Sequence, residues 1–157
     1  MTTEASVRAF FSSPQFAVVG ASSNPAKFGH KVLSWYASHS LPVTPINPST
    51  PSITPSGTSA AALPTLPSLS ALPDPAHTSV SIITPPAATL EVLREARRLG
   101  VPAVWLQPGT WDDEVLLYAR GQGGYGGEVV AGDGGRGHSG WCVLVDGEKG
   151  LREVGKL

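Results

Sequence analysis

The residues best suited to chemistry in this chain lie in four short polar segments, each directly after a predicted buried strand. These segments are Gly20–Pro25, Asn47–Pro48, Thr84–Pro86 and Gln107–Gly109. Backbone N–H groups near Gly20–Ser22, together with the N-terminus of the following helix, would suit a phosphate group. Lys27, His30 and Lys31 come near that helix start and would add positive charge. The alternative is that all four segments are ordinary strand-to-helix turns, which favour Gly, Pro and Asn for conformational reasons.

The sequence shows no arrangement typical of a catalytic centre. No Ser-His-Asp set and no pair of carboxylates follows the strands, and Asp112, Asp113 and Glu114 are placed as acids favoured at a helix start. The four histidines lack the spacing of metal ligands; they are His30, His39, His77 and His138. We therefore expect a binding site without reaction machinery and without a metal.

A nicotinamide dinucleotide is the first ligand that a Gly-containing turn after a strand suggests. Two features oppose it. The turn at Gly20 lacks the Gly-x-Gly-x-x-Gly spacing, and the second strand ends in Asn47, where an NAD site would have Asp or Glu for the ribose hydroxyls. Because these two features oppose NAD, an NAD(P)-binding oxidoreductase or redox sensor is kept as the alternative and not as the main prediction.

The elements that position these segments alternate along the chain. Short apolar runs predict strands over residues 16–20, 43–47, 79–83, 103–106 and 128–131, with a sixth over 141–145, and helical spacing predicts helices over 29–40, 87–99 and 112–120. Residues 68–72 suggest one short helical turn. This alternation is typical of an α/β three-layer sandwich with a mostly parallel sheet of five or six strands. Ligands of such sheets bind at the carboxyl ends of the strands.

Composition restricts the class of protein. The 157 residues fit one domain, the net charge of -1 argues against a nucleic-acid partner, and no apolar run is long enough for a membrane helix. The single cysteine, Cys142, excludes an internal disulfide framework, so we expect a cytoplasmic protein.

Within this single domain, 1–157, we expect a Pro/Ser-rich loop over 49–67 and a Gly-rich loop over 121–140. The latter is either a lid or a solvent-exposed flexible loop.

Several motifs, taken together and in order, resemble those of a known family. They are Val18-Val-Gly-Ala-Ser-Ser-Asn-Pro25, Lys27-Phe-Gly29, Ile46-Asn-Pro48, Pro85-Pro86 and Ala103-Val-Trp-Leu-Gln-Pro-Gly109. From about Phe16 to Val145 the chain resembles the small stand-alone CoA-binding domain proteins, which are similar to the N-terminal domain of the succinyl-CoA synthetase alpha subunit. The resemblance implies a Rossmann-like domain that binds coenzyme A or an acyl-CoA, as a non-catalytic binding or regulatory module.

The resemblance also implies roles for particular residues. The turn Gly20–Ser22 would approach the nucleotide phosphates, and Lys27 would provide the counter-charge. Asn47 and Pro48 would border the adenosine. Thr84, Pro85 and Pro86 would line the wall, and Gln107 and Gly109 would close the site near the pantetheine arm. The complete predicted set is Gly20, Ala21, Ser22, Asn24, Lys27, Phe28, Gly29, Asn47, Pro48, Thr84, Pro85, Pro86, Gln107 and Gly109.

The C-terminal part departs from the family pattern. Bacterial members carry Asp-Arg before a cysteine, whereas Gly140 and Trp141 precede Cys142 here. Two interpretations of Cys142 stay open: a thiol that forms a mixed disulfide with coenzyme A under oxidation, or a small buried hydrophobe in the predicted strand 141–145. One more alternative is a subunit that provides its CoA site to an acyl-CoA ligase partner. A homodimer is a further expectation.

Overall fold

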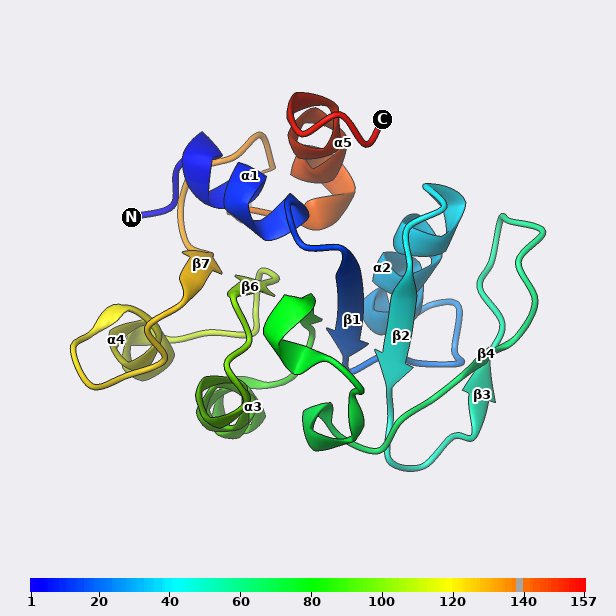
Figure 1. The fold of residues 1–157 in the computed structure, drawn as a ribbon, viewed down its shortest axis with the longest axis horizontal. Helices are drawn as coiled ribbons and strands as arrows, with labels where there is room; N and C mark the ends of the chain where they lie inside the picture. The colour runs from blue at the N-terminus through cyan, green and yellow to red at the C-terminus, as the bar shows by residue number, and fades with distance from the viewer. Residues whose placement is uncertain (138–139) are drawn as a thin grey trace.

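The protein is described by a computed structural model that covers residues 1–137 and 140–157. Its main sheet contains strands β1 (Gln15–Val19), β2 (Val43–Ile46), β5 (Thr78–Ile82), β6 (Ala103–Leu106) and β7 (Glu128–Val130). All four strand pairs are parallel, and the order across the sheet is β2-β1-β5-β6-β7. The predicted α/β class and parallel sheet are confirmed, with five strands (Figure 1).

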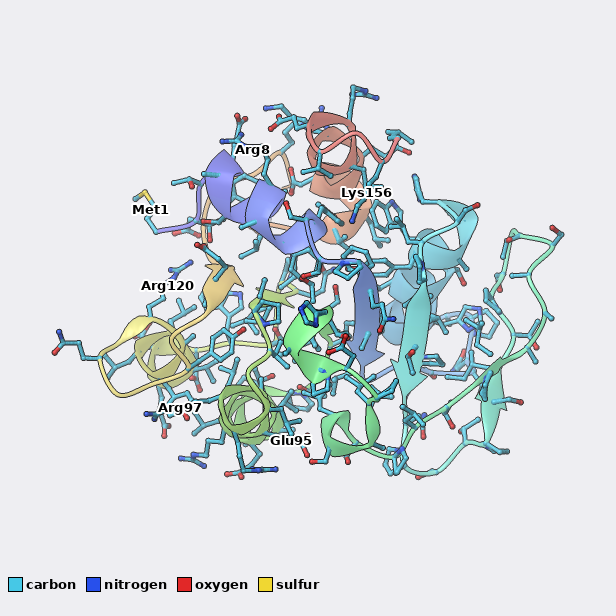
Figure 2. All side chains as sticks on the ribbon, in the orientation of Figure 1. Met1, Arg8, Glu95, Arg97, Arg120 and Lys156 are labelled. Atoms are coloured by element: carbon cyan, nitrogen blue, oxygen red, sulfur yellow. The ribbon has the colours of Figure 1, made fainter. Side chains whose placement is uncertain are left out.

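Helices cover both faces of this sheet and make the three-layer sandwich. Helices α1 (Glu4–Phe11), α2 (Phe28–Ser38) and α5 (Val143–Glu153) pack on one face, and α3 (Pro86–Leu99) and α4 (Asp113–Arg120) on the other (Figure 1). In Figure 2 the side chains of Arg8 and Lys156 lie on the α1–α5 side, whereas Glu95 and Arg97 lie around α3.

Alternation along the strands builds the two cores. In β1, Phe16 and Val18 point toward α1, α2 and α5, while Ala17 and Val19 point toward α3 and α4. All four are buried because both faces of the strand are covered. Strand β2 is at an edge of the sheet, where Pro45 is tolerated because one side of an edge strand needs no backbone donor.

Local signals explain where three helices begin or end. Asp112 caps α4 by accepting a hydrogen bond from the Val115 N–H at 2.9 Å. Pro86 occupies the first turn of α3, where its missing N–H costs nothing, and Gly100 ends that helix in the left-handed conformation. Helix α1 was not predicted; Thr3 and Ser6 form a reciprocal capping box at its start.

The predicted sixth strand over 141–145 is wrong. Those residues lead into α5, which begins at Val143 with Cys142 as its N-cap residue. The apolar run Trp141–Val145 is too short to distinguish a strand from a helix start. Val143 and Leu151 are buried on one face of α5, and glycines at 147 and 150 let that face approach Trp35 and Phe11 closely.

The Pro/Ser-rich segment 49–67 contains more structure than the predicted loop. Strands β3 (Ser52–Ile53) and β4 (Leu63–Pro64) pair antiparallel, and Leu66 bridges to Ile46 at the end of β2. Two short 3-10 helices, η1 (Leu69–Ala71) and η2 (Pro75–His77), complete the connection to β5. The predicted helical turn over 68–72 corresponds to η1.

The Gly-rich segment 121–140 is buried in part and exposed in part, with residues 129–132 buried and residues 133–136 exposed. Tyr125 is buried and donates from its hydroxyl to the Val101 carbonyl at 2.6 Å, and burial raises the pKa of that phenol. At the end of β7, Arg120 donates to the Ala131 carbonyl at 3.0 Å. Residues 138–139, and with them the predicted non-ligand His138, lie outside the described residues. None of the described helices is both long enough and apolar enough to span a bilayer.

Candidate nucleotide-binding site

The strand order places the candidate site at the border between β1 and β5. From β1 the chain moves outward to β2, and its next strand in the sheet, β5, lies on the other side of β1. Such a reversal leaves a crevice at the carboxyl ends of the two central strands. All four polar segments singled out in the sequence follow strands of this sheet, so parallel pairing brings them to one edge.

Two cavities lie along this edge. The first, here the β1–β2 cavity, has a volume of about 220 Å³ and is lined by Gly20, Ala21, Asn47, Pro48 and Thr84 among others. The second, the β6–α5 cavity, has a volume of about 520 Å³ and is lined by Phe28, Ile83, Gln107, Gly109, Cys142 and Val145 among others. Ile83 and Thr84 are neighbours in the chain but line different cavities, so the segment after β5 is the wall that both share.

Two glycines let the β1–α2 turn pack against its surroundings. Gly20 has a φ of 90°, and a Cβ there would overlap the backbone carbonyl oxygen of Ile83. A Cβ on Gly29 would overlap the carbonyl oxygen of Gly20. The turn, the start of α2 and the end of β5 are therefore in backbone contact, which no larger residue would permit.

The start of α2 has the properties of an anion-binding terminus. The N-cap residue, Lys27, has an extended backbone and makes no side-chain capping bond. Uncapped N–H groups and the positive end of the helix dipole favour a bound anion there. The side chain of Lys27 is exposed, as are those of Asn24 and Phe28. Asn24 stabilises the turn locally, since its Oδ1 accepts the Ala26 N–H at 3.0 Å and its N–H donates to Ser22 Oγ at 3.1 Å.

The side chain of Asn47 uses its hydrogen bonds to connect the turns after β1 and β2. Its Nδ2 donates to the Ala21 carbonyl at 2.9 Å, and its Oδ1 accepts the N–H groups of Ser49 at 2.7 Å and Thr50 at 3.0 Å. Pro48 next to it is exposed. Asn47 thus fixes the spacing between the turns after β1 and β2, and both residues line the β1–β2 cavity.

His30 has a role that the sequence did not indicate. It is buried, with 2% of its surface exposed, and its Nδ1 donates to the Ser22 carbonyl at 2.8 Å. Its Nε2 lies 2.7 Å from Ser56 Oγ. A carbonyl only accepts, so Nδ1 carries a proton, and in the neutral imidazole Nε2 accepts from the Ser56 hydroxyl. His30 therefore braces the turn against the segment 49–67, and both ring nitrogens are occupied.

The segment after β5 combines a cavity wall with a helix start. Thr84 lines the β1–β2 cavity, and its hydroxyl lies 2.8 Å from that of Thr89. Pro85 is the N-cap residue of α3, and Pro86 is its first residue. The two prolines fix the direction in which α3 leaves the sheet and line neither of the two cavities. They act on the site by shaping its backbone.

Gln107 connects the end of β6 to the start of α5. It is 3% exposed, its Oε1 accepts the Val143 N–H at 2.9 Å, and its Nε2 donates to Cys142 Sγ at 3.3 Å. Cys142 is partly exposed at the rim of the β6–α5 cavity. The interpretation of this residue as a buried hydrophobe in a strand is therefore wrong. Gly109, exposed with a φ of 88°, completes the turn.

Asp146 was missed by the sequence analysis and is central to this side of the site. It is 5% exposed; its Oδ2 accepts the Cys142 N–H at 3.0 Å and its Oδ1 accepts the Arg136 N–H at 2.9 Å. One carboxylate thus holds the start of α5 and the preceding Gly-rich segment together. An acid four residues after Cys142 is the signal of a helix first turn, but the predicted strand obscured it.

Comparison with known proteins agrees with this geometry. Residues 14–133 match the family model described as a CoA binding domain. A hypothetical protein from Pyrococcus horikoshii OT3 is 24% identical, with 96% of this chain and 93% of that chain covered and a TM-score of 0.75. A protein from Thermus thermophilus, cell-free ID.343, is 25% identical over 95% of this chain and 99% of its own, with a TM-score of 0.72.

A conserved hypothetical protein from Pyrococcus furiosus is 30% identical, over 73% of this chain and 90% of its own, with a TM-score of 0.60. The comparison with curated proteins found none that matches. The family match covers all five strands of the main sheet and the turns that follow β1, β2, β5 and β6. The fold, the position of the crevice and this match over most of the chain show that the protein belongs to the CoA-binding domain family.

Proposed function

We propose that this protein binds coenzyme A across the border between β1 and β5, as a binding or regulatory module without catalysis of its own. The observation that carries the proposal is the pair of cavities on either side of the segment Ile83–Thr84. A ligand with an anionic nucleotide end and a long uncharged arm fits such a divided site. The family membership supports the same class of ligand.

The nucleotide end belongs to the β1–α2 turn. The uncapped start of α2 provides backbone donors for a pyrophosphate, and Lys27 provides a positive charge. The adenosine occupies the β1–β2 cavity beside Asn47 and Pro48. Because the amide of Asn47 already makes three hydrogen bonds, it shapes this cavity and is not the residue that reads a ribose.

The pantetheine arm passes Ile83 and ends near Gln107 and Cys142. The wall of this second cavity consists mainly of apolar side chains and backbone, with Gln107 and Cys142 as its polar side chains, which suits an uncharged arm. In this arrangement the thiol of coenzyme A reaches the neighbourhood of Cys142 Sγ. Among the described residues in this part of the site, none is arranged as a nucleophile with an adjacent base, so we propose binding and not turnover.

Calorimetry with coenzyme A, acetyl-CoA, NAD and NADP on the same protein tests the proposal. Coenzyme A is expected to bind, and NAD and NADP are expected to give no heat of binding. Binding of NAD without any response to coenzyme A would reverse the assignment. Co-purification with a protein carrying ligase domains would instead favour a subunit that provides its CoA site to an acyl-CoA ligase.

The position of Cys142 gives an independent check on the direction of the arm. Diamide oxidises two thiols to a disulfide and is itself reduced to the hydrazine. With coenzyme A bound as proposed, diamide should join its sulfur to Cys142, and the protein mass should rise by one coenzyme A less two hydrogens. Cys142→Ser should abolish the mass increase, and no increase in the unsubstituted protein would contradict this placement of the thiol end.

A further inference from the structure

The β6–α5 cavity has a volume of about 520 Å³ and a lining that is mainly apolar. Its walls include Phe28, Ile83, Pro108 and Val145, which come from four different segments of the chain. Phe28 is 59% exposed and Val145 is 41% exposed, which makes both of them exceptions among the large hydrophobic residues of a well-packed domain. Exposed apolar surface gathered in a cavity is typical of a site that an apolar group occupies.

The polar groups of this cavity are already engaged. Both ends of the Gln107 amide are hydrogen-bonded, one to the Val143 N–H and one to Cys142 Sγ. The nearby carboxylate of Asp146 accepts two backbone N–H groups and is buried behind Cys142. Among the described residues that line the cavity, none carries a charge. A carboxylate placed here would lose hydration, and the nearest described cations already face other groups: Arg136 donates to the Val145 carbonyl at 3.0 Å, and Lys31 Nζ lies 5.3 Å from the centre of the Phe28 ring.

The cavity also lies where the far end of the ligand would be. It shares the wall Ile83–Thr84 with the β1–β2 cavity, and Phe28 belongs to the same helix start that would hold the phosphates. A ligand anchored by its phosphates at that helix start therefore presents its sulfur, and whatever the sulfur carries, to this second cavity.

We infer that the protein selects the acylated form of coenzyme A, and that the β6–α5 cavity holds a neutral, apolar acyl group. This inference rests on the proposed binding of coenzyme A. It assigns Phe28, Ile83, Pro108 and Val145 as the residues that contact the acyl chain. It also predicts discrimination against acyl groups that end in a carboxylate, such as succinyl.

Calorimetry with coenzyme A, acetyl-CoA, butyryl-CoA, hexanoyl-CoA and succinyl-CoA tests the inference. Affinity should rise from acetyl to butyryl by about threefold to fourfold for each methylene that becomes buried. Butyryl-CoA should bind more tightly than both free coenzyme A and succinyl-CoA. Equal affinity for all five ligands, or the tightest binding for free coenzyme A or succinyl-CoA, would overturn the inference and leave the binding of coenzyme A in place. If none of the five binds, the proposed function itself fails.

A substitution then places the acyl group in this cavity. Val145→Trp fills the space next to Cys142 and should remove the preference for butyryl-CoA over coenzyme A. Leu117→Trp is the matched control, since Leu117 is also an exposed apolar residue of a helix, 74% exposed, but lies on α4 away from the cavity. A butyryl preference that survives in folded Val145→Trp would show that the acyl group lies elsewhere. The chain-length series on the unsubstituted protein decides the selectivity even if this variant does not fold.

Discussion

The two sides of the candidate site are built in different ways. The β1–α2 side is held by close backbone approaches of Gly20 and Gly29 and by the hydrogen bond from Asn47 to the Ala21 carbonyl. The β6–α5 side brings Gln107 to Cys142 and Val143, which lie 35 and 36 residues further along the chain. The cavity on the first side has a volume of about 220 Å³, whereas the cavity on the second side has a volume of about 520 Å³. A short motif specifies the turn at the first side, whereas the second side exists only once the C-terminal helix has packed.

The largest expected effect comes from filling the space at Gly20. Gly20→Ala adds a Cβ that overlaps the Ile83 carbonyl oxygen and forces a positive φ on alanine, so the free energy of unfolding should fall by about 2–5 kcal/mol. Gly109→Ala on the other side has the same backbone conformation, with a φ of 88°, but meets no atom within 4 Å. It should cost only about 1–2 kcal/mol. Urea unfolding of the two variants compares them; equal losses would contradict the tight packing of the β1–α2 turn.

Removing the carboxylate of Asp146 should have the next largest effect. Asp146→Ala leaves the N–H groups of Cys142 and Arg136 without their acceptor, which should lower the free energy of unfolding by about 2–4 kcal/mol. Asp146→Asn keeps the volume and one acceptor oxygen, so its loss should be smaller. Urea unfolding measures both. An Asp146→Ala protein as stable as the unsubstituted one would show that α5 is held at this side by its apolar face alone.

Lys27→Ala tests the charge on the β1–α2 side without disturbing its packing. Lys27 is exposed, so the variant should fold normally but bind coenzyme A about tenfold more weakly, which corresponds to about 1–2 kcal/mol for one charge-assisted contact. The difference should diminish as salt is added. Arg94→Ala is the control, because Arg94 is an exposed cation on α3 that pairs with Glu91. Calorimetry that finds the two variants equal would remove Lys27 from the site.

The smallest effect concerns the ion pairs that attach α5 to α1. Arg8 donates to Glu153 at 2.9 Å, and with Lys149 nearby it holds the pKa of Glu153 below its usual value of 4.5. The depressed pKa means that this carboxylate stabilises the fold above its unfolded pKa and loses that contribution as the pH falls through its folded pKa. Glu153→Gln should therefore be slightly less stable than the unsubstituted protein at pH 7 and equally stable near pH 3. Thermal unfolding at the two pH values gives the comparison, and a pH-independent difference would contradict it.

Most of the main sheet could be predicted because its strands are buried on both faces. Such strands read as continuous apolar runs ended by Gly, Asn or Pro, and the run Ala103–Leu106 was predicted to the residue. The polar segments that follow the strands could then be placed at one edge by the rule for parallel sheets. The capping box of α1 and the pairing of β3 with β4 were not recognised, because each depends on few residues of ordinary turn composition.

For the candidate site, residue types alone did not reveal which polar side chains are available to contact a ligand. Asn47 and His30 are the usual residues for contacting a ligand, yet the fold uses their hydrogen bonds to connect separate loops. The sequence predicts a strand at Cys142 because five apolar residues in a row, 141–145, fit either element. Only the packing of α5 against α1 and α2 exposes its sulfur at a cavity.

The sequence by itself determined the class of fold, the edge of the sheet that carries the candidate site and the turn proposed for a phosphate. Each of these follows from local periodicity and turn chemistry, which act over a few neighbouring residues. The tertiary structure alone decided that Gln107, Cys142 and Asp146 meet, that His30 is a brace, and that an apolar cavity opens beside Val145. Those outcomes depend on contacts between distant segments, which form only where burial of apolar surface in the two cores outweighs the entropy of ordering the chain.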